Sequence, residues 1–269
     1  AALPQEKVQL ALAGDLQAQC TASSYAMREL GVPFAGLFGA CSTMAEGLAL
    51  GAALCEGGAA RNLLAMASSH FCAAERQFRT PLSYGAVRTP TAQWTATAAG
   101  CCLLQPQGEG VGIAAATFGR VQDYQVKDIN NMGAAMAPAA ASTLLRYFKD
   151  TGTEPQEFDC IYTGDLGQVG SQLLRELLAA EGLLIKNHVD CGCILFDANE
   201  QSVKSGGSGP GCCAAVLCGH ILPRLRRGSQ KRVLFTATGA LMSQTTFLQK
   251  ETIPAVAHLV ELRAPEKEK

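Results

Sequence analysis

The hydrophobic and polar positions of the chain form short apolar runs that alternate with amphipathic segments. The runs LALAG (10–14) and CIYTG (160–164) are bounded by turn residues, which predicts buried strands of a mostly parallel sheet. The segments 22–30 and 171–182 space their apolar residues as helices do, and a glycine closes each of them. The pattern therefore predicts units of strand, helix, strand, helix and strand.

This pattern occurs twice along the chain. PQEKVQLALAGDLQ from Pro4 matches PQEFDCIYTGDLG from Pro155, and GGAARNLLAMASS matches GSQKRVLFTATG further along each half. An internal repeat of this length indicates a duplicated α/β unit. We therefore predict an incomplete N-terminal half over residues 1–110 and a C-terminal half over residues 111–269.

The junction of the two halves adds two expectations. Residues 92–121 hold two strand-like runs around the turn PQGEG, which predicts a β-hairpin. The C-terminal half has a strand near 111–121 and a helix near 138–150 before its GDL motif, whereas little more than AALPQE stands there in the N-terminal half. The first strand and helix of the N-terminal half are therefore expected to be missing.

Composition narrows the classes of protein. The 269 residues carry a formal charge of -1, so the chain lacks the basic field that gathers nucleic acid. No apolar run approaches the roughly 20 residues that span a bilayer, so we expect a soluble chain that could dock on a membrane complex. The 12 cysteines stand largely in apolar runs, which is typical of buried thiols. His188, Cys191 and Cys193 lack the paired spacing of zinc sites, so no metal is expected.

Cys41 is the strongest single candidate for chemistry. It stands in FGACSTMAEG directly before a predicted helix at 42–56, where the positive end of the helix dipole would lower the pKa of a thiol. The alternatives to a nucleophile are a residue that lines a pocket and a small buried side chain. A nucleophile needs an oriented base, and His70, at the end of a predicted strand, is the best placed histidine. A loop histidine with a structural hydrogen bond is its alternative.

Other polar groups follow predicted strands on the same face. Asp15 and Asp165 hold equivalent places in the two halves, where they either cap helices or contact a ligand. Gly207 and Ser208 in GGSGPG precede a predicted helix, whose free N–H groups could hold an anion, although glycines there could equally allow close packing. The sequence lacks the glycine-rich fingerprints of nucleotide loops.

The segment 68–94 is rich in arginine and aromatic residues. It contains, close together in sequence, Arg76, Arg79, Tyr84, Arg88 and Trp94. A guanidinium can bind a carboxylate with two hydrogen bonds, and an aromatic ring can stack on a planar ligand. Solvated loop charges are the alternative.

Several long motifs together resemble a known family. FGACSTMAEGLAL, SSHFCAAERQFRTPLSYG, MGAAMAPAAASTLL, TGDLGQVG, GGSGPGCCA and VLFTATGALMSQ closely resemble the stage V sporulation protein AD family of spore-forming bacteria, over about residues 10–261. The resemblance implies an α/β, thiolase-like fold with two pseudo-equivalent βαβ halves in a five-layer αβαβα arrangement. The family carries an additional N-terminal strand and helix, which agrees with the gap seen in the repeat.

The resemblance also implies a function and its partners. The family binds dipicolinic acid, pyridine-2,6-dicarboxylate, and supports its transport into the developing spore and its release at germination. It works with membrane-embedded proteins of the same sporulation channel complex and is usually dimeric. We therefore expect a homodimer at the spore inner membrane, attached peripherally. No cofactor and no nucleic acid are expected, and dipicolinate would bind either free or as its calcium chelate.

The same resemblance bears on catalysis. Thiolase-like condensing enzymes combine the cysteine of ACS with a later histidine motif and an asparagine motif, but Gly164 and Gly207 stand at those two places here. Cys41 is kept without its partners, which favours binding over an acyltransferase or condensing enzyme that uses Cys41 as nucleophile, with His70 or Asp165 as its base. A scaffold without a ligand is a third possibility. The expected ligand contacts are Asp15, Cys41, Ser42, His70, Arg79, Asp165, Gly207 and Ser208.

Overall fold

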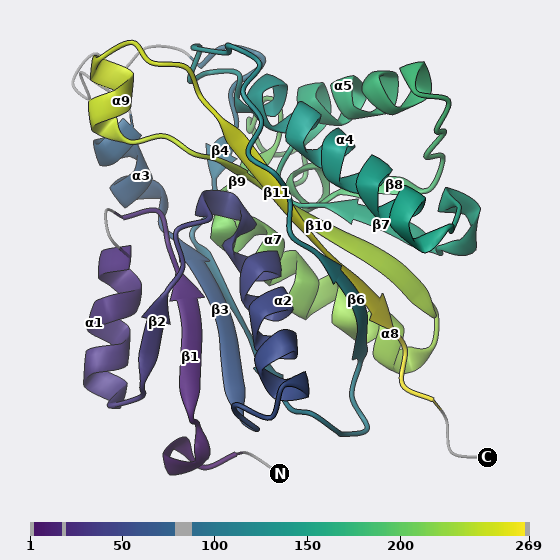
Figure 1. Ribbon diagram of the computed structural model, residues 1–269. Helices are drawn as coiled ribbons and strands as arrows, with labels where there is room; N and C mark the ends of the chain where they lie inside the picture. Colours follow the sequence, from purple (N-terminus) through teal and green to yellow (C-terminus); the bar gives the residue numbers. More distant parts are fainter. Residues whose placement is uncertain (1–2, 18–19, 79–87, 267–269) are drawn as a thin grey trace.

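A computed structural model describes residues 3–17, 20–78 and 88–266 of the chain. Two mixed sheets lie side by side with helices between them and on both outer faces (Figure 1). From one side to the other, the layers are helix, sheet, helix, sheet and helix. The fold is therefore the five-layer α/β arrangement that the family resemblance implies.

The first sheet belongs to the N-terminal half and has the strand order β2-β1-β3-β5. Its central strand β1 runs parallel to β2 and β3, whereas β5 is antiparallel to β3. Small residues such as Ala11 and Ala65 fill the positions between the helices and allow the layers to pack closely. The strands are β1 (Leu10–Gly14), β2 (Phe34–Gly36), β3 (Leu63–Ser69) and β5 (Ala98–Leu104).

The second sheet belongs to the C-terminal half and has the order β6-β11-β10-β7-β8. Strand β10 runs parallel to β7 and antiparallel to β11, as β3 does to β1 and β5. The repeat that the sequence predicts is therefore confirmed for four strands of each sheet, and β6 has no counterpart among the described residues. The strands are β6 (Gly112–Thr117), β7 (Cys160–Thr163), β8 (His188–Asp190), β10 (Arg232–Ala240) and β11 (Ala255–Arg263).

Two helical stretches fill the central layer between the sheets. One is α2 (Thr43–Glu56); the other runs from α7 (Pro210–Val216) through the π-helical segment η6 (Leu217–Ile221) into α8 (Leu222–Arg227). Helix α2 contacts β3 of the first sheet and β10 and β11 of the second. Met44 and Leu48 of α2 are buried, and each such side chain contributes about 1.5–3 kcal/mol of hydrophobic free energy.

The outer layers hold the amphipathic helices. Helix α4 begins at the cap Asn131, whose side chain accepts a hydrogen bond from the N–H of Ala134, so the helix starts six residues before its expected first residue. The outer helices are α1 (Thr21–Leu30), α4 (Met132–Thr151) and α5 (Gly167–Ala180), whereas α3 (Phe71–Phe78) directly follows β3 at the carboxyl end of that strand. Shorter elements are η1 (Gln5–Lys7), η3 (Ala40–Ser42), β4 (Trp94–Thr95), η5 (Pro155–Glu157), α6 (Cys191–Ile194), β9 (Gly207–Ser208) and α9 (Gln244–Leu248).

The hairpin expected over residues 92–121 is wrong. Strand β5 pairs with β3 and strand β6 pairs with β11, so the two strands lie in different sheets. The turn between them therefore connects one sheet to the other, and each strand pairs with a strand of its own half. Within the described residues β5 has no neighbour beyond it, whereas its counterpart β11 pairs with β6.

Candidate functional site

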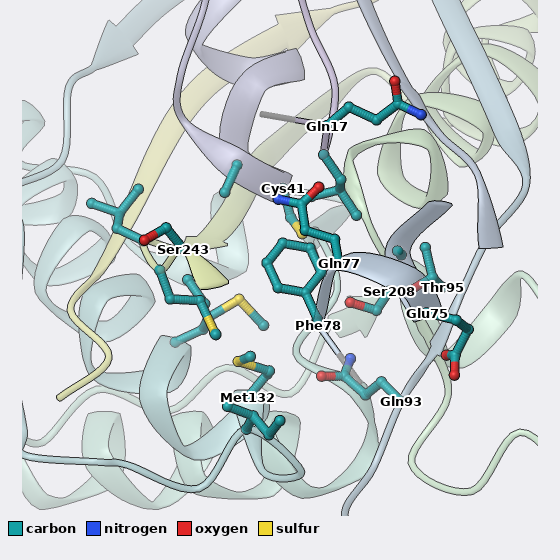
Figure 2. Close-up of a pocket in the computed structure, with 18 of the residues that line it drawn as sticks. Gln17, Cys41, Glu75, Gln77, Phe78, Gln93, Thr95, Met132, Ser208 and Ser243 are labelled. Carbon is teal, nitrogen blue, oxygen red and sulfur yellow. The ribbon is translucent and has the colours of Figure 1, made fainter. Parts of the chain in front are cut away.

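A pocket of about 590 Å³ opens at the carboxyl ends of the parallel strands, and both halves of the chain line it. The N-terminal half contributes the loop after β1, the turn before α2 and helix α3. The C-terminal half contributes the start of α4, Ser208 of β9 and the segment 240–246 after β10. Figure 2 shows Cys41 among these residues, with Gln77 and Phe78 of α3 in front of it in this view. This is the sheet edge at which ligands gather in such folds.

A strained turn positions Cys41 at the start of α2. Ala40 has a φ of 49°, in the left-handed region that costs a side-chain-bearing residue on the order of 1–3 kcal/mol. The Ser42 hydroxyl donates to the carbonyl of Gly39 at 2.6 Å, and the Thr43 hydroxyl donates to the carbonyl of Ala40 at 2.7 Å. These bonds hold the turn. They also direct Ser42 into the protein, so this predicted contact does not line the pocket.

The carboxyl group of Asp165 is fully buried beside Cys41. It accepts hydrogen bonds from the Ser208 hydroxyl at 3.0 Å, the Gly209 N–H at 2.8 Å and the Thr238 hydroxyl at 3.0 Å. Burial raises the pKa of Asp165, and these hydrogen bonds oppose that shift. The Gly209 N–H of the GGSGPG turn is therefore bonded to a carboxyl oxygen of the protein itself.

The expectation of an acidic thiol at Cys41 is wrong. Its side chain is buried, and that burial raises the pKa of the thiol well above its ordinary value. The nearby carboxyl group of Asp165 raises the pKa further, by its charge and by a hydrogen bond. Desolvation and a neighbouring anion outweigh the helix dipole, so Cys41 is held as the neutral thiol.

None of the four histidines lines the pocket. Ser69 ends β3 with its hydroxyl turned inward, where it donates to the carbonyl of Ala96 at 2.7 Å and accepts from the Gly211 N–H at 3.1 Å. His70 is the next residue; it is exposed and does not line the pocket, so its contact with a ligand stays a prediction. His188 and His258 lie elsewhere, where burial lowers the pKa of each to about 4.

Asp15 and Gly207 each accept hydrogen bonds from other groups of the protein. The Asp15 carboxylate accepts from the N–H and hydroxyl of Ser23 at 2.8 and 2.7 Å, which ties the loop after β1 to α1, and it also lines the pocket. The Gly207 carbonyl accepts from the side-chain amide of Gln93 at 3.0 Å behind the pocket lining. Ser208 lines the pocket directly. Direct ligand contact by these residues stays a prediction.

Arg88 is the arginine that the structure brings to the pocket. Its guanidinium forms an ion pair with Glu75, lies 4.3 Å from the centroid of the Trp94 ring and donates to the carbonyl of Gln93 at 2.9 Å. The predicted contact Arg79, and Tyr84 with it, lie outside the described residues. The arginine and aromatic pattern of the segment identified the region, and only the structure distinguishes Arg88 within it.

Several apolar lining residues were not predicted, because they come from distant segments that meet only in the fold. They are Phe38, Phe78, Met132, Met136, Leu241 and Met242. Across the described ranges, no group of three or more His, Cys, Asp or Glu side chains is arranged to hold a metal ion. Nor does any helix in the described part of the chain have the length and apolar character needed to cross a membrane.

Comparison with solved structures defines the class of protein. The chain superposes on 3-oxoacyl-(acyl-carrier-protein) synthase III from Aquifex aeolicus with a TM-score of 0.58 at 13% identity, covering 96% of this chain and 78% of that one. OleA from Xanthomonas campestris gives a TM-score of 0.61 at 14% identity, covering 97% and 76% of the two chains. The fold is therefore thiolase-like, the fold of these condensing enzymes.

Comparison of sequences gives the family within that class. The family model described as stage V sporulation protein AD (SpoVAD) matches residues 1–263. Stage V sporulation protein AD of Bacillus subtilis (strain 168) is 43% identical over 257 residues, which cover 95% of this chain and 76% of that protein. The chain belongs to the stage V sporulation protein AD family.

Proposed function

We propose that the pocket binds dipicolinic acid without catalysis and thereby supports the transport of this acid into the spore and its release at germination. Membership of a sporulation protein family supports the biological setting. One observation supports binding without catalysis: the group beside Cys41 is the buried carboxyl group of Asp165, and no histidine lines the pocket.

The chemistry around Cys41 opposes acyl transfer. A cysteine nucleophile reacts as the thiolate, and burial beside Asp165 favours the neutral thiol. The N–H of Gly209, which could stabilise a developing oxyanion, is bonded to Asp165. A general base and an oxyanion donor each contribute on the order of 10²–10⁴ in rate, so a site without them would be slow.

The pocket suits a small planar acid. Its volume of about 590 Å³ falls within the range of roughly 300–1,000 Å³ that is usual for small-molecule sites. Phe78 and Met132 offer apolar surface to a ring, while Arg88 offers a guanidinium to a carboxylate. Gln77 and Ser208 add polar groups that could fix the orientation of a dicarboxylate.

The partners of this function are part of the proposal. We place the chain as a homodimer on the membrane-embedded proteins of the sporulation channel complex, peripherally at the inner membrane of the forespore and spore. No cofactor is required, because the pocket would only bind and release its ligand. Sedimentation of the purified chain and its capture by those membrane proteins in detergent would test these two associations.

Calorimetry of the purified chain with dipicolinate tests the proposed ligand. Benzoate and benzene-1,3-dicarboxylate serve as competitors, because the second lacks only the ring nitrogen and the first lacks both that nitrogen and one carboxylate. Titrations with and without calcium separate binding of the free acid from binding of its chelate. We expect selective binding of dipicolinate that persists in Cys41→Ala, with Cys72→Ala as a matched control at an exposed cysteine outside the pocket. Equal binding of all three acids by a folded chain would contradict the proposal.

An acyltransferase or condensing enzyme that uses Cys41 remains the alternative function. The strained turn at Ala40 and the position of Cys41 at the start of α2 favour it, because strain of this kind is concentrated at functional sites. Incubation with acyl-coenzyme A followed by mass spectrometry distinguishes the two. A stable acyl adduct on Cys41, absent from Cys41→Ala, would support the enzyme and overturn non-catalytic binding.

A further inference from the structure

Two cysteines from opposite halves of the chain meet outside the pocket. Cys102 lies on β5 of the first sheet, and Cys218 lies on the π-helical segment η6 of the central layer. Their sulfur atoms are 3.9 Å apart although 116 residues separate them in sequence. Both residues are partly exposed.

The backbones around this pair lie unusually close. Gly100 stands two residues before Cys102, and a Cβ atom placed on it would lie only 2.5 Å from the carbonyl oxygen of Ala214 in α7. Strand β5 also packs directly against η6. Rotation about the two side chains would need to close a gap of about 2 Å to reach the disulfide bond length of about 2.05 Å. The sulfur atoms are therefore already close enough for a modest rotation of the two side chains to bring them toward bonding distance.

The two thiols are not equivalent. Their mutual hydrogen bond lowers the pKa of Cys218 to about 7 and raises the pKa of Cys102. The thiol of Cys218 also lies 3.7 Å from the carbonyl oxygen of Cys101, and the positive charge of Arg226 favours its thiolate. A thiolate beside a second thiol is the arrangement that undergoes thiol–disulfide exchange. A π-helical turn, in which Cys218 lies, is frequent at functional sites.

We propose that Cys102 and Cys218 form a redox pair that closes to a disulfide when it meets a low-molecular-weight disulfide. With cystine, the Cys218 thiolate attacks one sulfur, breaks the S–S bond and releases one cysteine thiolate. The Cys102 thiol then gives its proton to the released cysteine thiolate, and its sulfur attacks the Sγ atom of Cys218, which breaks the mixed disulfide and releases the second cysteine as a thiolate. Two protein thiols are oxidised to one disulfide, and one cystine is reduced to two cysteines.

The disulfide would join the two halves of the chain. It would fasten β5 of the first sheet to the helix that continues from α7, whose first turn follows Ser208 and Gly209 at the pocket. A link between residues so distant in sequence removes much of the freedom of the unfolded chain. The oxidised protein should therefore resist unfolding more strongly, and its halves should hold their separation across the pocket.

The test is to oxidise the reduced chain with cystine under native conditions, block free thiols and digest without reduction. We expect mass spectrometry to find a disulfide-linked peptide pair that fragmentation assigns to Cys102 and Cys218. The intact oxidised protein should have the mass of one chain, which shows that the disulfide lies within a chain. The midpoint of thermal unfolding should rise by roughly 5–10 °C and return on reduction. Failure to link the pair, or mixed disulfides with cysteine alone, would overturn the proposal.

Four variants make the assignment specific. Cys102→Ser and Cys218→Ser should each abolish both the link and the rise in the unfolding midpoint. Cys101→Ser leaves one cysteine on β5 and should keep both effects, so loss of the link in this variant would identify Cys101 as the true partner and overturn the assignment. Cys72→Ser is the matched control at an exposed cysteine on α3 and should behave as the original chain does. Circular dichroism of each reduced variant shows that the comparison is between folded proteins.

Discussion

At the residue scale, the ion pair of Arg88 and Glu75 lies in the wall of the pocket, where the proposed acid would meet it. Both side chains are largely buried, with exposed fractions of 13% and 15%, and Glu75 lines the pocket as well. A ligand carboxylate that binds Arg88 must share it with this carboxylate. We predict that Glu75→Gln tightens dipicolinate binding and that Arg88→Gln weakens it, each by about tenfold, since a charged hydrogen bond contributes about 1.5 kcal/mol.

Calorimetry on both variants measures this, with Gln17→Ala as a control at a neutral lining residue that has no part in the proposed ligand contacts. If neither Glu75→Gln nor Arg88→Gln changes the affinity for dipicolinate, the ligand does not reach Arg88.

Sequence alone predicts only part of this site. Cys41 could be selected because it precedes a predicted helix, and Asp165 because it follows a repeated strand, but the burial that raises the pKa of Cys41 depends on packing from both halves.

At the scale of the element, the turn before α2 depends on its close contact with β10. A Cβ atom on Gly239 would lie 2.3 Å from the carbonyl oxygen of Gly39 and 3.0 Å from the backbone nitrogen of Ser42. We predict that Gly239→Ala destabilises the chain by about 1–3 kcal/mol, the usual cost of overpacking, and displaces Cys41. Urea unfolding measures the first effect, and the alkylation rate of Cys41 measures the second.

Gly112→Ala is the matched control, because Gly112 also lies in a strand and no atom within 4 Å would meet its Cβ. Equal stability of Gly239→Ala and Gly112→Ala would show that the turn before α2 can shift without lowering the free energy of unfolding.

The elements were largely predictable because the strands β1, β7, β3 and β10 are apolar runs in a repeated order. The hairpin was not, because two adjacent strand-like runs do not reveal that each pairs with a more distant strand.

At the scale of the whole molecule, a buried charge network ties the outer helix layer to the second sheet. Glu261 of β11 has a side chain only 3% exposed and accepts from Arg232 of β10 at 2.7 Å. Tyr147 of α4 donates to the same carboxylate, and Arg263 does so at 2.7 Å. Burial alone would raise the pKa of Glu261, but these hydrogen bonds outweigh it and lower the pKa to about 2.

A depressed carboxyl pKa makes stability depend on acid in a defined direction. The unfolded chain binds a proton at Glu261 near the ordinary value of 4.5, whereas the folded chain does so at about 2. The contribution of Glu261 to stability is therefore fully present above pH 4.5 and is lost as the pH falls through about 2.

We predict that Glu261→Gln lowers the free energy of unfolding by about 3 kcal/mol at pH 7, because it leaves Arg232 partly unpaired. The variant should also lose less stability than the original chain as the pH falls from 4.5 to about 2. Urea unfolding at a series of pH values measures both effects, with Glu157→Gln as control, since Glu157 pairs with the same arginine at 3.1 Å but is nearly half exposed. Parallel pH curves for the original chain and Glu261→Gln would show that the network does not couple folding to protonation.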